Sequence, residues 1–334
     1  MGQRYQKKKK KKKWLWIMLL TPVLLLLLVA GYAVSQYYSG LKQTEKSGDV
    51  AKTEKVTFNG QKDIEGKVNI LLVGDDHRKG EKRSNSDSMM IVQYDPDTKA
   101  AKVVSLMRDM YVSIPGYNDS KLNAAYRIGG PELLRKTIKE NFGVDVQYYV
   151  AIDFKGFERV IDTLAPDGIK INVEKAMSKN IGVSLEPGWQ NLNGKQLLGY
   201  ARFRHDAESD FGRVRRQQQV IKAVTNKIVS ANGIMKAPKL LGTIQPYVRT
   251  NIDKLDGLAL MKDLLFFDTK NIETLTLPVK GSWTNGRINR DQIGLILRID
   301  KKANSEAVQS FLNGDQNSEV AHSKESSSSN DVPH

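Results

Sequence analysis

The sequence contains no cysteine and only four histidines among its 334 residues. The lack of cysteine excludes a disulfide framework and thiol chemistry, and it permits an exposed, oxidising location. The histidines lack the paired spacing of a zinc site, so we do not expect zinc. The phosphate-binding loop Gly-x-x-x-x-Gly-Lys-Ser/Thr, the nucleophile turn Gly-x-Ser-x-Gly and the protein-kinase motifs are also absent. The sequence therefore points away from P-loop NTPases, serine hydrolases of that type and kinases.

Acidic residues are missing from residues 1–13, which carry Arg4 and the seven lysines Lys7–Lys13. This segment accounts for +8 of the net charge of +15, so the high pI alone is weak evidence for a nucleic-acid partner. An uncharged apolar run follows from Trp14 to Val34. At about 1.5 Å per residue it spans one bilayer core. With lysines before it and aromatic residues near both ends, it predicts a single-pass anchor in the cell membrane, with the N-terminus cytoplasmic and the rest extracellular.

A cleaved signal peptide is the competing interpretation of this run, although the run is longer than a usual signal-peptide core. With the anchor uncleaved, composition divides the chain into five segments. They are a cytoplasmic polybasic segment at 1–13, a transmembrane anchor at 14–34, a polar extracytoplasmic linker at 35–65, a catalytic domain at 66–302 and a disordered polar tail at 303–334.

Residues 66–302 show apolar runs that alternate with helical patterns. We expect strands at 68–73, 89–94, 102–107, 147–152, 169–173 and 273–279. We expect helices at 131–142, 154–164, 212–231, 238–248, 255–266 and 291–302, and a short one from Asn193. This alternation predicts a single α/β domain with a central mixed β-sheet flanked by helices.

An arginine-rich stretch, Tyr200–Gln219, is the strongest chemical signal of the chain. It contains Arg202, Arg204, Arg213, Arg215 and Arg216, whereas the rest of the chain favours lysine. A guanidinium group is planar and permanently charged, and its donors fit two phosphate oxygens at once. The composition therefore favours a phosphate-binding role over the simpler alternative of a solvated basic helix end.

The spacing within this stretch predicts two faces that bind one polyanion. Arg202 and Arg204 are two residues apart, so they share a face if the segment is extended. Arg213, Arg216 and Gln217 share one side of the helix expected from residue 212. They lie in its first turn, where free N–H groups and the helix dipole favour an anion.

Acidic residues and a further arginine follow the predicted strands. Asp76 and Asp87 lie at or near strand ends, where α/β sheets bind ligands. Two carboxylates with phosphate oxygens and water would suit Mg²⁺, although aspartate is also common in ordinary turns. Arg108 follows the third strand and emerges at the same sheet edge as Asp76 if the two strands run parallel.

Five motifs occur in one order: Leu71–Arg78, Ser86–Met90, Ser105–Asp109, Lys121–Tyr126 with Gly129-Gly130, and Arg202–Gln217. On these motifs, residues 67–230 closely resemble the LytR-CpsA-Psr family of cell-wall assembly proteins. The resemblance implies an extracytoplasmic enzyme of Gram-positive bacteria. Such an enzyme transfers an anionic glycopolymer, such as teichoic acid or capsule, from a polyprenyl-pyrophosphate carrier to peptidoglycan. The product is a phosphodiester to a muramic acid hydroxyl.

The resemblance also implies roles for individual residues. Asp76 and Asp87 match metal-associated acids that hold Mg²⁺, for which Mn²⁺ can substitute. The catalytic set is Arg108, Asp76, Arg202 and Arg204. The pyrophosphate-binding set is Arg78, Arg108, Lys121, Asn123, Arg202, Arg204, Asp210, Arg213, Arg216 and Gln217. The chain departs from the family at Met107, where proline is usual, and at Asn85, where arginine is frequent.

The partners implied are the lipid-linked glycopolymer, peptidoglycan and membrane lipid, and no nucleic acid is expected. Three other functions use the same residues: a polyprenyl-pyrophosphate pyrophosphatase with water as acceptor, a membrane regulatory protein whose cations contact DNA, and a non-catalytic polymer-binding module. The proton acceptor also stays open between Asp76, Asp109 and a metal-bound water.

Overall fold

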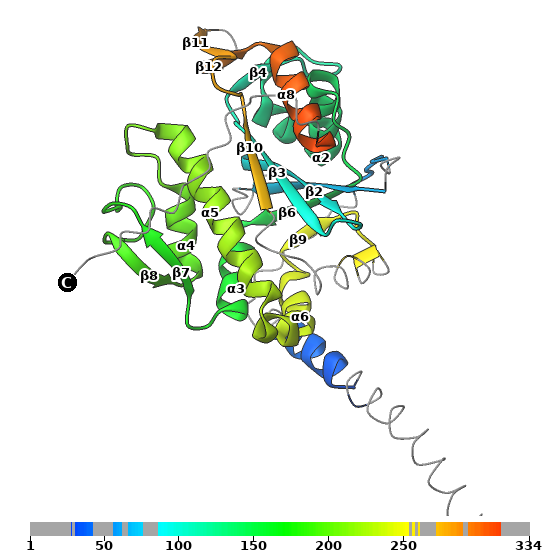
Figure 1. Ribbon diagram of the computed structural model, residues 1–334, viewed down its shortest axis with the longest axis vertical. Coiled ribbons are helices and arrows are strands. Elements are labelled where there is room, and N and C mark those ends of the chain that lie inside the picture. Colours follow the sequence, from blue (N-terminus) through cyan, green and yellow to red (C-terminus); the bar gives the residue numbers. More distant parts are fainter. Residues whose placement is uncertain are drawn as a thin grey trace, which may run out of the picture. The chain divides into compact units, whose positions relative to one another are not determined.

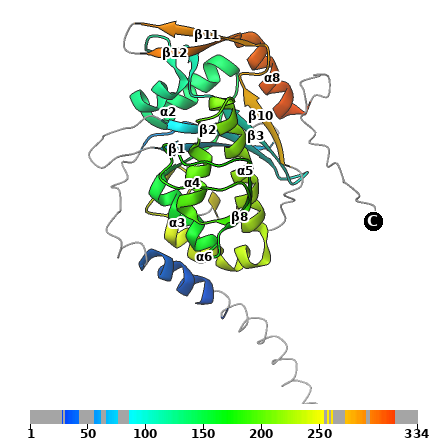
Figure 2. The same ribbon diagram turned by 90° about the vertical axis from the view of Figure 1, so that its left-hand side faces the viewer.

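The computed structural model describes residues 28, 31–42, 56–61, 66–75, 86–253, 256–257, 260, 272–289 and 293–314 (Figures 1 and 2). The chain forms two compact units, each described here by itself. Unit 1 comprises residues 1–55 and 150–270, and unit 2 comprises residues 56–149 and 271–334. The single predicted domain therefore divides into two units, and the chain crosses between them within the strand that begins at Tyr148.

A mixed sheet forms the centre of unit 2. Within unit 2 its strands are β1 (Val68–Asp75), β2 (Ser86–Asp95), β3 (Ala100–Leu106) and β10 (Ile272–Leu277), which follow one another in the order β10-β3-β2-β1. β2 is antiparallel to both β1 and β3, and β10 is parallel to β3. β1, β3 and β10 therefore run in one direction. This confirms the predicted strands and the predicted mixed sheet.

Apolar side chains hold this sheet against two helices, α2 (Leu122–Phe142) and α8 (Lys301–Asn313). Leu71 and Ile91 of the sheet are 0% exposed, as are Ile138 of α2 and Val308 of α8. Burying each such side chain contributes about 1.5–3 kcal/mol to folding. The motif Lys121–Tyr126 opens the first segment of α2, which was not predicted as helical. The backbone leaves helical geometry at Gly130, with φ of 68°, and the second segment begins at Pro131, where the helix was predicted to start.

A second sheet of unit 2 carries the loop that borders the site described below. Its strands are β4 (Met110–Val112), β5 (Ser120–Lys121), β11 (Trp283–Ile288) and β12 (Gly294–Ile299), in the order β11-β12-β4-β5. β4 and β5 pair antiparallel, with Tyr111 opposite Lys121. This pairing fixes both ends of the loop 113–119.

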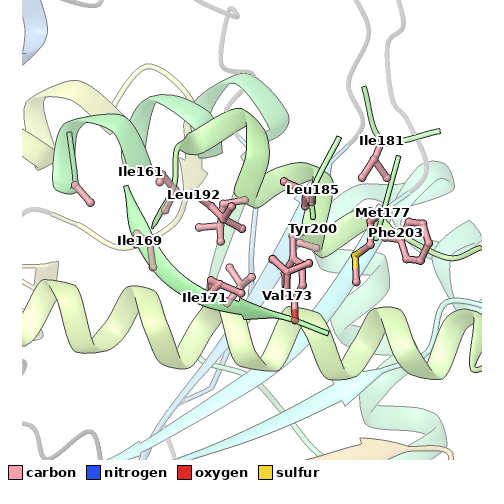
Figure 3. Packing of buried hydrophobic residues seen from close by; sticks show 14 of the residues in the cluster. Ile161, Ile169, Ile171, Val173, Met177, Ile181, Leu185, Leu192, Tyr200 and Phe203 are labelled. Carbon is pink, nitrogen blue, oxygen red and sulfur yellow. The ribbon is translucent and has the colours of Figure 1, made fainter. Parts of the chain in front are cut away.

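Unit 1 packs helices against a two-stranded sheet. Its elements are the end of β6 (Tyr148–Asp153), α3 (Phe154–Leu164), β7 (Ile169–Val173), β8 (Gly188–Leu192), α4 (Gly194–Arg202), α5 (Ser209–Val229), α6 (Ala231–Ile244) and β9 (Val248–Thr250). Alternate residues of β7 are buried, namely Ile169, Ile171 and Val173. They meet Ile161 of α3 and Tyr200 of α4 in one apolar cluster (Figure 3). This core holds the segment between α4 and α5 in place.

The helix of residues 31–42 packs tightly on α6 within unit 1. A Cβ atom at Gly40 would collide with the backbone of Lys239, and one at Gly242 would collide with the backbone of Tyr37. Only glycine allows the two helices to approach this closely.

The predicted span 14–34 lies mostly outside the described residues. Among the residues described, no helix combines the length and the apolarity that a bilayer crossing requires.

The C-terminal part of unit 2 corrects two predictions. The helix predicted at 291–302 is wrong, because Gly294–Ile299 forms β12, which pairs with both β11 and β4. The polar tail predicted from residue 303 is wrong for its first turns, because α8 continues to Asn313 and buries Ala307, Val308 and Leu312. These three apolar residues recur at helical spacing and give the segment a face to bury.

The predicted polar linker 35–65 is also wrong in part. Residues 31–42 form a helix, and residues 56–61 pack within unit 2. The ring of Phe58 lies 4.9 Å from that of Tyr149, and the backbone N–H of Asn59 donates to Glu132 Oε2 over 3.0 Å. A single aromatic side chain thus anchors a segment whose composition is otherwise that of a spacer.

Candidate functional site

One edge of the unit 2 sheet brings Arg108 and Asp87 together. β1 and β3 end at this edge, and β2, antiparallel to both, begins there. Asp87 is the second residue of β2, and Arg108 lies two residues after the end of β3. Arg108 Nη1 donates to Asp87 Oδ1 over 2.6 Å, and the two side chains are 21% and 26% exposed. β1 and β3 run in the same direction, which is the condition under which Arg108 was expected at this edge.

Charges of alternating sign continue from this pair. Arg108 Nε lies 3.5 Å from Asp109 Oδ2, and Lys121 Nζ lies 2.8 Å from Asp109 Oδ1. Asp87, Arg108, Asp109 and Lys121 therefore form one string. Because β4 and β5 pair beside it, both cations are held in place before any ligand binds.

Asp87 has the chemistry of a magnesium ligand. Its carboxylate oxygens are hard donors, and Mg²⁺ in proteins is usually held by one or two carboxylates together with phosphate oxygens and water. Its partial exposure leaves access for such a ligand set. Asp76 and Arg78 lie outside the described residues, so the pair of Asp76 and Asp87 stays a prediction.

A cavity of about 480 Å³ opens beside this string of charges. It is lined by Arg108, Asp109, Tyr117, Asn118, Asp119, Ser120, Lys121, Asn123, Ala124, Arg127, Ile128 and Ile293. Three predicted ligands, Arg108, Lys121 and Asn123, thus share one cavity. Its wall holds three cationic side chains and two carboxylates, as expected of a site for a polar, charged molecule.

In unit 1 the start of α5 gathers a second group of predicted residues. Asp210 lies in the first turn of α5, and its two carboxylate oxygens lie 3.5 Å from Arg204 Nε and 3.5 Å from Arg213 Nη2. The Arg204 side chain is 41% exposed, whereas that of Arg213 is 5% exposed. Asp210 therefore orients two guanidinium groups, of which Arg204 is the one open to a ligand.

Arg202 differs from its prediction. Arg202 is the last residue of α4, and extended backbone begins only at Phe203. The shared face predicted for Arg202 and Arg204 required both residues to lie in one extended segment, so that prediction is wrong. Its guanidinium lies 4.3 Å from the centre of the Phe154 ring, a cation–π contact. Gln217 donates to the carbonyl of Ala201 over 3.4 Å and so ties α5 to the end of α4.

Arg216 is fully buried, with 0% of its side chain exposed. It donates to Glu174 over 2.6 Å, to Asp206 over 2.9 Å and to the carbonyl of Phe203 over 2.8 Å. The neighbouring Arg215 donates to Glu174 and to Glu208, each over 2.6 Å. These contacts join β7, the loop after α4 and the helix α5.

The carboxylates of this network are held ionised by the arginines. Burial raises the pKa of Glu174, but hydrogen bonds from Arg215 and Arg216 outweigh burial and hold the pKa below its ordinary value. Burial likewise raises the pKa of Asp206, and the hydrogen bond from Arg216 brings it below the ordinary range. Glu174, Asp206 and Glu208 lie close enough to share a cation, and guanidinium groups already supply that charge.

Sequence reasoning missed several residues of both groups. Tyr117, Asn118 and Arg127 line the cavity, and the turn signal Pro115-Gly116 just before Tyr117 was the available clue. Glu174 and Asp206 pair with Arg216 across separations of 42 and 10 residues, and no local pattern indicates such pairs.

A sequence model of the LytR_cpsA_psr family matches residues 31–303. The regulatory protein MsrR of Staphylococcus aureus is 47% identical over 286 residues, covering 85% of both chains. The polyisoprenyl-teichoic acid–peptidoglycan teichoic acid transferase TagU of Oceanobacillus iheyensis is 34% identical over 226 residues, 66% of this chain and 69% of that protein.

A solved structure supports the same relationship. The crystal structure of Bacillus subtilis TagV aligns with a TM-score of 0.62 and 28% identity, and covers 74% of this chain and 97% of that one. The family match spans most of the chain and includes the Arg108 and Arg204 groups. On this evidence of sequence and fold, the chain belongs to the LytR-CpsA-Psr family.

Proposed function

We propose that this protein transfers an anionic cell-wall glycopolymer from a polyprenyl-pyrophosphate carrier to peptidoglycan, forming a phosphodiester to a muramic acid hydroxyl. The observation that carries the proposal is the sheet edge of unit 2. There Arg108 pairs with Asp87 beside a cavity that Lys121 and Asn123 also line. Two relatives in the family, TagU and TagV, are named as transferases of this type.

The chemistry proposed needs charge neutralisation more than covalent help. The hydroxyl oxygen of the acceptor forms a bond to the phosphorus that carries the glycopolymer. The bond from that phosphorus to the bridging oxygen breaks, and its electron pair leaves with polyprenyl phosphate. The hydroxyl proton passes to Asp109, a carboxylate in the cavity wall beside Arg108.

The cations of the chain stabilise the negative charge that develops on the phosphate oxygens. We assign this role to Arg108 and Lys121, which line one cavity of unit 2. The catalytic role of Arg202 and Arg204 stays a prediction from the family resemblance. Asp210 pairs with Arg204 and Gln217 donates to the carbonyl of Ala201, so both hold the start of α5 against the end of α4 and the residues after it. Arg213 pairs with Asp210 within α5. When Mg²⁺ or Mn²⁺ is bound, Asp76 and Asp87 would hold it, and it would supply positive charge that stabilises phosphate oxygens.

We also propose that residues 14–34 anchor the protein in the cell membrane, with residues 1–13 in the cytoplasm and both units outside. The charge and apolarity of the sequence support this topology. It would place the site on the side of the membrane where peptidoglycan is assembled. Protease treatment of intact protoplasts tests it, since digestion of both units is expected and full protection would contradict it.

Replacement of Arg108 tests the transfer function. In a reconstituted assay with a defined lipid-linked donor and peptidoglycan oligomers, Arg108→Ala should lower the transfer rate by about 10²–10³, the usual cost of one lost oxyanion donor. Thermal stability should change little, because its pair with Asp87 is partly exposed. The matched control is Arg159→Ala, an exposed arginine of α3. Full activity of Arg108→Ala would contradict the proposed role.

The same assay separates transfer from hydrolysis. With water as acceptor, polyprenyl phosphate and a glycopolymer phosphate monoester would form at equal rates with or without peptidoglycan. Transfer predicts that product formation depends on peptidoglycan and yields a phosphodiester. Binding of both substrates without turnover would instead favour a polymer-binding or regulatory role, which the name of the MsrR relative suggests.

A further inference from the structure

The cavity beside Arg108 extends past the residues given a role above. Its outer wall is formed by Tyr117, Asn118, Asp119 and Ser120 of one loop and by Arg127 of α2. Tyr117 is 57% exposed, and Asn118, Asp119 and Arg127 are exposed as well. Among the described residues, Arg127 has no ion-pair partner. The outer wall is therefore accessible, and its charge is available to a ligand.

A well-defined turn in the loop 113–119 fixes the backbone of Tyr117. The backbone N–H of Tyr117 donates to the carbonyl of Ile114 over 2.9 Å and closes a turn through Pro115 and Gly116. Gly116 has φ of 78°, which the third position of a type II turn requires, and proline favours the second position. Ile114 is only 2% exposed and anchors the turn. The tyrosine ring is thus held outward by a well-defined backbone.

The side chains of the outer wall match the chemistry of a sugar better than that of other ligands. The exposed ring of Tyr117 offers an apolar face to the C–H face of a pyranose. Asn118 donates and accepts, and Asp119 accepts, as a ring of hydroxyl groups requires. A site for phosphate alone would not place the Asp119 carboxylate in its wall, and a slot for a lipid tail would be apolar.

Arg127 adds a preference for a negative charge on that sugar. Its guanidinium forms a two-point contact with a carboxylate or a phosphate. On the inner side, the same cavity is bounded by Arg108 and Asp109, where the hydroxyl attacks in the proposed reaction. A sugar in the outer part would therefore place one of its hydroxyl groups next to the reacting phosphorus.

We infer that the outer part of this cavity is a saccharide subsite, in which Tyr117 stacks on a sugar ring and Arg127 pairs with an acidic group of the same sugar. The inference rests on the proposed function for its choice of partner. Both substrates of that reaction carry anionic sugars, the acceptor in peptidoglycan and the donor in the glycopolymer. The position next to Asp109 assigns the subsite to the acceptor.

Direct binding tests the inference without any turnover. The full-length protein in lipid nanodiscs is titrated with a soluble disaccharide peptide released from peptidoglycan, and the dissociation constant is measured by calorimetry. Tyr117→Ala should weaken binding by about tenfold, the factor that a lost aromatic stack represents. Tyr117→Phe should bind nearly as tightly as the wild type, because the ring is kept. Trp189→Ala removes another exposed aromatic residue, 67% exposed on β8, and should leave binding unchanged.

Kinetics then distinguish the two sources of the sugar. In the transfer assay, Tyr117→Ala and Arg127→Ala should raise the KM for peptidoglycan oligomers about tenfold and leave the KM for the lipid-linked donor unchanged. A rise confined to the donor KM would keep the saccharide subsite and move it to the donor. Unchanged binding and unchanged KM values for both substrates in Tyr117→Ala would overturn the inference. Binding that depends on Tyr117 in a protein that catalyses no transfer would refute the proposed function while leaving the subsite in place.

Discussion

Arg216 should stabilise unit 1 far more than its neighbour Arg215, although both are arginines of α5 paired with Glu174. Arg216 is 0% exposed and Asp206, which it contacts over 2.9 Å, is 4% exposed. Arg216→Ala would leave the buried Asp206 carboxylate and the Phe203 carbonyl without this donor. Removing one partner of a buried ion pair typically costs about 3–5 kcal/mol. For a domain of this size the melting temperature should fall by roughly 10 °C.

Arg215→Ala is the matched control for this prediction. Its side chain is 40% exposed, and its partners Glu174 and Glu208 are 23% and 50% exposed. Pairs of this kind contribute about 0–1 kcal/mol. Thermal and urea unfolding of both variants, followed by circular dichroism, gives the comparison. Equal stability of the two variants would refute the argument that Arg216 acts by joining β7, the loop after α4 and α5.

Two further measurements test the ionised carboxylates around Arg216 and the proposed metal site at Asp87. The pKa values of Glu174 and Asp206 are held low in the folded protein, so their stabilisation is present at neutral pH and is lost as the pH falls below about 4. Urea unfolding from pH 7 to pH 3 should show this loss in the wild type and a smaller loss in Arg216→Ala; parallel curves would contradict it. Chelation of divalent cations should slow transfer strongly, and added Mg²⁺ should restore it. A rate indifferent to chelator, or an unaffected Asp87→Asn variant, would argue against the metal site.

Local sequence patterns predicted much of the fold. α3 has the bounds expected, Phe154–Leu164, because Asp153 caps it and its side chain accepts from the Gly156 N–H. The first three strands are apolar runs bounded by turn residues. β12 was mistaken for a helix because Leu295–Leu297 is a short apolar run, which periodicity alone does not assign to a helix or a strand. Asp300, whose side chain accepts from the Ala303 N–H, marks the true start of the last helix.

The candidate site was predictable where it depends on strand order and not where it depends on tertiary pairing. Arg108 follows the recognisable strand β3, and Asp87 lies at the start of the recognisable strand β2. Their positions at the same edge of the sheet could therefore be predicted. Arg216 was predicted to bind pyrophosphate from its position on α5. Its burial against Glu174 and Asp206 arises from the packing of β7 on α5, which no helical spacing reveals. That pairing supports a positioning role for Arg216, with ligand contact left to the more exposed Arg204.

The close crossing of the helix 31–42 and α6 limits how far unit 1 can move away from the segment that precedes it. A flexible spacer the length of residues 35–65 would have a root-mean-square span of about 30 Å. The backbones of Gly40 and Gly242 leave no such freedom for the first part of that segment, because the helix is fixed to α6. With the apolar run in a bilayer, unit 1 would stand at one height above the lipid. In the proposed reaction, the glycopolymer would then have to span the distance to glycan strands that lie farther from the membrane.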